Sequence, residues 1–164
     1  MSEDTELPKG ADGEVAADPT FSPLRCEKLV TFAGGTTDAW GDDAGALDGG
    51  ILFTVTGTVR VRIIGIVETS LVGAATINVG VTGGVATLIA QCANATGMDV
   101  GEIWHDADVD AMVEASTVMD EKIISNGLDI RLYNGTADIT AGAIRFLVSW
   151  YPISKDGRVI PSSN

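Results

Sequence analysis

The stretch TVRVRIIGIVETSL, residues 58–71, indicates the fold class more clearly than any other part of the sequence. Apolar side chains at positions 59, 61 and 63 alternate with two arginines, which is the period-two pattern of a strand with one buried face. The alternation shifts by one residue beside Gly65, and such a shift next to a glycine predicts a β-bulge. The stretch therefore predicts a long, half-buried strand.

Other short β-branched runs flank this stretch, and glycine-rich turns separate them. They predict strands over 26–33, 51–57, 75–81, 85–91, 128–134 and 143–153, with Thr82–Gly84 as a hairpin turn between the third and fourth. Short strands at this spacing are typical of an antiparallel β-sandwich or jelly roll. Because aromatic residues make up only 5% of the chain, we expect a core built mainly from aliphatic side chains.

The all-β domain is expected to span residues 24–155 as a single unit. Residues 1–23 carry six acidic residues against Lys9 alone and few large apolar groups, so we expect an extended acidic N-terminal arm. Residues 156–164 predict a C-terminal tail of turn and coil. Cys26 and Cys92 are far apart in a chain without a visible secretory signal, so two free, buried thiols are expected.

Segment 106–127 is ambiguous between a helix and two strands. Its acidic start and a C-terminal Asn-Gly fit a helix, whereas its β-branched content and its surroundings favour strands over MVEAST and EKIIS. The preceding stretch GEIWHDADVD, residues 101–110, contains the only histidine of the chain. We interpret it as a hydrated loop between strands, with Ile103 and Trp104 in the core.

Asp106, Asp108 and Asp110 match the first three acidic positions of a calcium-binding loop. Ala111 and Thr117 occupy the positions that such a loop reserves for glycine and a bidentate glutamate, so only a looser calcium site is open to these residues. The Gly/Asp loop of residues 33–50 could hold a cation in the same manner or be merely solvated. No other metal, and no cofactor, is expected.

The formal net charge of −13 argues against direct binding to nucleic acid or to an anionic membrane, because both require clustered lysine and arginine. No signal peptide and no apolar segment of membrane-spanning length is visible. A nucleophile–histidine triad could only be centred on His105, and no GxSxG motif occurs. With nine aromatic residues, the chain also offers few stacking groups for sugars. We therefore expect a protein that is not an enzyme.

Residues 50–155, and above all EIWHDADVDAMVEASTVMDEKIISNGLDI at 102–130, resemble small virion structural proteins of tailed bacteriophages. The resemblance implies a head decoration or accessory capsid protein that docks as an oligomer, commonly a trimer, on a shell of major capsid protein. It implies a place on the capsid exterior after assembly in the host cytoplasm. Two alternatives remain: a tail tube or adaptor subunit, and a calcium-assisted carbohydrate- or receptor-binding sandwich.

An acidic arm that orders on docking would suit such a role, since its ordering entropy opposes premature binding. An indole amid aspartate and glycine packs either in its own core or on a partner, which makes Trp40 a second candidate. The predicted partner contacts are therefore Glu3, Asp4, Glu6, Phe21, Leu24 and Trp40.

Overall fold

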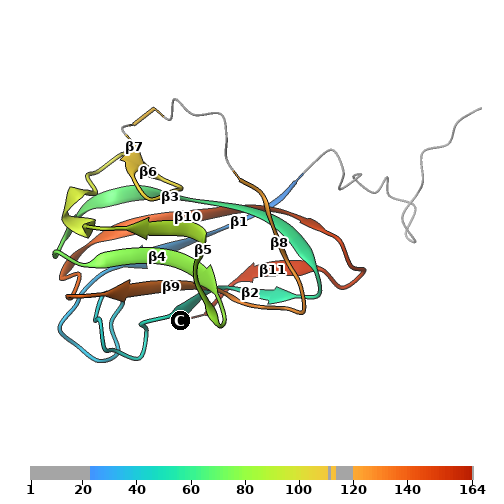
Figure 1. The fold of residues 1–164 in the computed structure, drawn as a ribbon, viewed down its shortest axis with the longest axis horizontal. Coiled ribbons are helices and arrows are strands. Elements are labelled where there is room, and N and C mark those ends of the chain that lie inside the picture. The colour runs from blue at the N-terminus through green and yellow to red at the C-terminus, as the bar shows by residue number, and fades with distance from the viewer. Residues whose placement is uncertain (1–22, 111, 114–119, 164) are drawn as a thin grey trace, which may run out of the picture.

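The computed structural model describes residues 23–110, 112–113 and 120–163, and within them eleven strands form two antiparallel sheets (Figure 1). The first sheet has the order β1-β10-β3-β6-β7, with β8 also paired to β3. Its strands are β1 (Leu24–Thr31), β3 (Val59–Val72), β6 (Ile103–Trp104), β7 (Val109–Asp110), β8 (Lys122–Ile124) and β10 (Ala141–Pro152).

The second sheet has the order β11-β2-β9-β4-β5. Its strands are β2 (Gly50–Thr56), β4 (Thr76–Val81), β5 (Gly84–Cys92), β9 (Ile130–Gly135) and β11 (Arg158–Pro161). A single 3-10 turn, η1 (Ala95–Gly97), follows β5. Figure 1 shows β3 and β10 lying beside one another in the first sheet, with β4 and β9 in the second. The prediction of an all-β antiparallel sandwich is confirmed.

Strand β3 keeps a single alternation from Val59 to Val67, with every second residue buried and Gly65 among them. The β-bulge expected at Gly65 is therefore wrong. The register with β10 shifts further along, because Val67 pairs with Ile144 whereas Thr69 pairs with Ala143. The extra residue thus lies between Val67 and Thr69.

The inward position of Gly65 explains why the sequence pattern was misleading there. A Cβ atom at this position would lie 3.0 Å from the Ile144 side chain and 3.4 Å from the Trp104 ring. Glycine leaves room for the indole beside the strand, so a residue without a side chain continues the buried face. The two isoleucines beside it, Ile64 and Ile66, point to the outer face and are partly exposed.

The predicted hairpin is confirmed as β4 and β5, and Gly83 in its turn adopts a φ of +81°, which glycine tolerates best. The C-terminal tail, by contrast, was wrongly predicted as coil. Arg158–Pro161 forms β11, which pairs with β2 along its whole length and buries Val159 to 3% exposure. Four residues ending in proline give a weak strand pattern, but a proline is acceptable at the end of an edge strand.

Segment 106–127 is described in part. Its strands are β7 at the start and β8 near the end, so the strand predicted over EKIIS is confirmed. Met112 and Val113 belong to no strand. Residues 111 and 114–119, which include most of MVEAST, lie outside the described residues.

The core lies between the sheets and consists mainly of valine, isoleucine and leucine, as expected from the low aromatic content. Its largest fully buried side chains include Trp104, Phe53, Phe146, Leu52, Ile77, Ile89 and Met98. Both cysteines are free; Cys92 is buried, whereas Cys26 is only half-buried. Within the described residues, no helix has the length and apolar character needed to cross a bilayer.

Candidate partner-binding surface

The stretch GEIWHDADVD forms the short β6–β7 hairpin, which extends the first sheet beside β3. Trp104 is fully buried, and its ring meets that of Phe146 edge to face at a centroid distance of 6.2 Å. Its Nε1 donates a hydrogen bond to the backbone oxygen of Asp106 at 2.8 Å. Trp104 is thus buried and anchors the stretch, as predicted. The stretch is a hairpin of two short strands where a loop was expected, and Ile103 is only partly buried.

The three acids of this stretch do not converge on a common point. The His105 Nε2 atom lies 3.1 Å from an Asp110 carboxylate oxygen, so Asp110 pairs with the histidine. The Asp106 carboxylate accepts a hydrogen bond from the Asp108 backbone N–H at 2.9 Å, which closes the turn between the strands. Asp106, Asp108 and Asp110 are therefore not a group of three within ligand distance, and the looser calcium site has no geometric support there.

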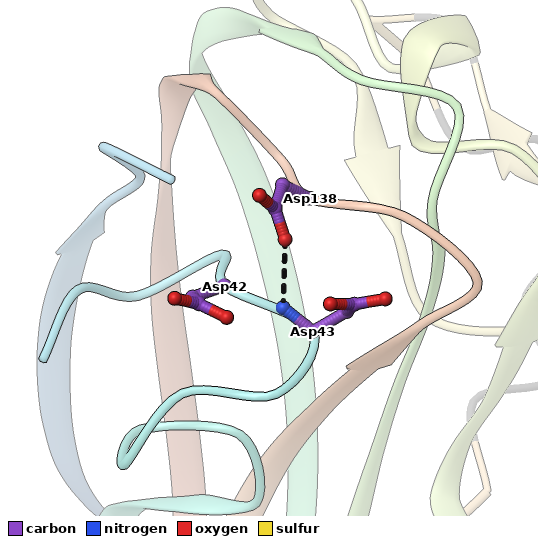
Figure 2. A group of neighbouring side chains, drawn as sticks. All are labelled: Asp42, Asp43 and Asp138. Atoms are coloured by element: carbon purple, nitrogen blue, oxygen red, sulfur yellow. Dashed lines mark hydrogen bonds between the residues drawn. The ribbon is translucent and has the colours of Figure 1, made fainter. Parts of the chain in front are cut away.

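A different acidic group does converge, at the edge of the Gly/Asp loop (Figure 2). Carboxylate oxygens of Asp42, Asp43 and Asp138 all lie within 4.8 Å of one another, the only such group of three among the described residues. Asp138 comes from the segment between β9 and β10. It is far from the other two in the sequence, so local spacing could not have revealed this group.

The group is tied together by backbone hydrogen bonds. The Asp43 N–H donates to Asp138 at 3.0 Å, and the Ala44 N–H donates to Asp42 at 3.0 Å. Desolvation, followed by repulsion from Asp138 and its hydrogen bond, raises the pKa of Asp43 above its ordinary value. These hydrogen bonds stabilise the turn at residues 42–44 and hold the three carboxylates close together. They leave spare oxygen lone pairs that a hard cation such as calcium could use.

The predicted partner contacts are placed unevenly by the structure. Trp40 is buried at 9% exposure, and its ring packs against Gly50, so the prediction that it contacts a partner is wrong. The indole lies in the chain's own core, which is the alternative to a partner contact for an indole in a polar loop. Leu24 begins β1 and is 47% exposed, which leaves it accessible. Glu3, Asp4, Glu6 and Phe21 lie outside the described residues.

A surface that the sequence did not indicate lies beside the β6–β7 hairpin. Val100, Met112 and Val113 are 53%, 70% and 79% exposed. Together with Asp99 and Glu102 they line a hollow of about 500 Å³. We call these five residues the Val100 surface. Large apolar side chains exposed side by side are uncommon on a soluble domain and mark sites of contact.

Hydrogen bonds to β3 hold the Val100 side of this surface, residues 100–102, in place. The Gly101 N–H donates to the Val67 carbonyl at 2.8 Å, and the Val67 N–H donates to the Glu102 carbonyl at 3.0 Å. The Val100 N–H donates to the Ser70 hydroxyl at 3.0 Å. A loop fixed at this many points presents its apolar side chain with little further loss of entropy on binding.

Gly101 shapes the surface by its conformation. Its φ is +89°, and a Cβ atom there would lie 3.2 Å from the Met112 side chain. Glycine therefore lets the loop turn while Met112 closes over it. The rim is acidic: Glu102 accepts a hydrogen bond from the Asp99 N–H at 2.7 Å, which keeps its carboxylate near the apolar centre. The arrangement places two carboxylates beside an exposed apolar centre, which suits binding to a protein surface.

The comparisons with known proteins identify no relative. No protein-family model, no curated protein and no solved structure matches the chain.

Proposed function

We propose that the protein is a structural component of a phage virion, a head decoration protein that docks as an oligomer on a shell of major capsid protein. The observation that carries the proposal is the Val100 surface, an exposed apolar site on a small β-sandwich. The sequence resemblance of residues 50–155 to phage virion proteins supplies the biological setting. The proposed oligomer is a trimer on the capsid exterior.

The energetics suit attachment through many copies. Burying a large aliphatic side chain completely is worth about 1.5–3 kcal/mol. Because Val100, Met112 and Val113 are between 53% and 79% exposed, covering each one contributes about 1–2 kcal/mol. A contact of this size is weak for one copy. A trimer that engages three equivalent sites binds with a higher overall affinity through avidity, without any new kind of contact.

The charge of the protein defines the chemistry of the partner. Asp99 and Glu102 flank the apolar centre, and the chain as a whole has a formal net charge of −13. A matching site on the shell would present an apolar group surrounded by lysine or arginine, which steers association and fixes orientation. Leu24 and the arm residues Glu3, Asp4, Glu6 and Phe21 supply a second contact in this proposal.

Co-sedimentation with shells assembled from the major capsid protein tests the proposal. Val100→Asp and Met112→Asp each place a charge at the apolar centre, so each is expected to weaken binding about tenfold or more, the equivalent of about 1.4 kcal/mol. Ile160→Asp is the matched control, because Ile160 is 40% exposed on β11 in the other sheet. Wild-type occupancy by both surface variants would contradict the proposal.

The structure also gives weight to the calcium-assisted binding module, through Asp42, Asp43 and Asp138 instead of the predicted triad. Melting temperature in calcium separates the two functions, because a ligand that binds only the folded state raises it. The mass of the assembled oligomer separates a head protein from a tail subunit, since a trimer fits a head site and a large ring fits a tail tube or adaptor.

A further inference from the structure

The outer face of the first sheet carries an apolar strip between arginines. Ile64 of β3 pairs with Leu147 of β10, and both side chains point away from the core and are partly exposed. Two pairs further along, on the same face, Ser149 of β10 lies between Arg25 of β1 and Arg62 of β3. The face thus places two guanidinium groups beside an aliphatic floor.

These residues line a hollow of about 330 Å³, together with Pro23 and the half-buried Cys26. Arg25 is exposed, and its side chain makes no ion pair or hydrogen bond to the described part of the chain. Arg62 is 43% exposed and lies 3.7 Å from Glu121, near the limit of an ion pair. Both groups can therefore accept a further carboxylate.

Other arginines of the same face are already engaged. Arg145 pairs with Glu68 at 2.6 Å and with Glu27 at 3.2 Å. Arg60 lies over the ring of Tyr151 at 4.4 Å. The hollow is therefore the part of this face where positive charge is least neutralised, in a protein that is otherwise strongly acidic.

The chain itself supplies a segment with the complementary charge. Residues 1–22 contain six acidic residues and one lysine, and they join the domain at Pro23, on the rim of the hollow. At about 3.3 Å per residue the segment can extend about 70 Å, far enough to turn back and cross the sheet. A second copy of the sheet face would instead set arginines against arginines, which is repulsive.

We propose that residues 1–22 fold back onto the outer face of their own first sheet in the free protein. Their carboxylates pair with Arg25 and Arg62, and their apolar side chains cover Ile64 and Leu147. Tethering favours this intramolecular contact, because a short linker gives the segment a millimolar effective concentration. The inference concerns the free chain and does not depend on the proposed virion function.

Paramagnetic relaxation enhancement in the full-length chain tests the inference. A spin label attached through Ala16→Cys, with Cys26→Ala and Cys92→Ala, is expected to broaden the backbone amides of Ile64 and Leu147. The broadening should disappear in about 1 M salt, where the Debye length is about 3 Å. Broadening that persists there, or none at low salt, overturns the proposal.

Charge variants locate the contact. Arg25→Glu with Arg62→Glu is expected to abolish the broadening, whereas Arg158→Glu, a control on the exposed edge of the second sheet, should leave it unchanged. Broadening that survives in the double variant refutes the ion pairs. A mixture of isotope-labelled and separately spin-labelled chains should show none. Broadening in the mixture assigns the segment to a neighbouring copy and overturns the intramolecular contact.

Discussion

Replacing Trp104 with alanine should remove a large part of the stability of the domain. Trp104 is fully buried, packs against Gly65, and meets Phe146 edge to face. A buried tryptophan truncated to alanine costs about 3–5 kcal/mol, and loss of the aromatic pair accounts for about 0.5–1.5 kcal/mol beyond simple burial. Since domains of this kind unfold with about 5–15 kcal/mol, a loss near 4 kcal/mol is severe.

Urea unfolding followed by far-ultraviolet circular dichroism measures this effect without depending on tryptophan fluorescence. With a slope of about 2 kcal/mol per molar urea, Trp104→Ala should lower the midpoint by about 2 M. Trp104→Phe retains a ring against Phe146 and should lose about half as much or less. Ile123→Ala is the control: its side chain is 66% exposed on β8, so the change should stay within about 0.5 kcal/mol.

A loss below about 1 kcal/mol in Trp104→Ala would refute the role of Trp104 as the anchor of the β6–β7 hairpin. Variants of Trp104 also test whether the hairpin positions the Val100 surface, because residues 100–102 are hydrogen-bonded to β3 next to this hairpin. If Trp104→Phe keeps the fold but weakens shell binding, the hairpin positions that surface.

Three further predictions follow from particular contacts. Truncation after Gly157 removes β11 and the buried Val159, and should lower the free energy of unfolding by at least about 2 kcal/mol; an unchanged urea midpoint would contradict this. Hydrogen bonds from the Ser154 side chain and from its own backbone lower the pKa of Asp156. The charged carboxylate therefore stabilises the fold at pH values above the ordinary aspartate pKa, and this stabilisation is lost as the pH falls through the lowered pKa. Asp156→Asn should accordingly lower the free energy of unfolding at pH 7 and not at pH 2. Urea unfolding at the two pH values measures this difference. Millimolar calcium should leave the melting temperature of wild type unchanged; a rise of several degrees that Asp138→Asn abolishes would favour the binding module.

Period-two patterns in the sequence predicted most of the strands. Strand β3, the β4–β5 hairpin, β9 and β10 were all predictable, because each alternates or forms a β-branched run bounded by glycine. The β-bulge predicted at Gly65 was wrong, because a glycine at an inward position looks in sequence like a break in the alternation. β11 was missed because four residues are too few to show a period, and its pairing with β2 is fixed only by tertiary contacts.

The candidate surfaces were less predictable, for a physical reason. Whether Val100 or Trp40 faces solvent depends on how a loop folds over a strand, which hydrogen bonds to β3 decide for Val100. Both residues lie in polar, glycine-containing stretches that look alike in sequence. The carboxylate group needs Asp138 to meet Asp42 and Asp43 across the fold, and no local motif encodes that distance.

Electron cryomicroscopy of the proposed virion is the most direct test of the proposed function. We expect density on the exterior of the head that fits the two-sheet sandwich, with Val100 and Met112 turned towards the major capsid protein. Density for the chain in the tail, or on the head with both residues facing solvent, would contradict the proposed function.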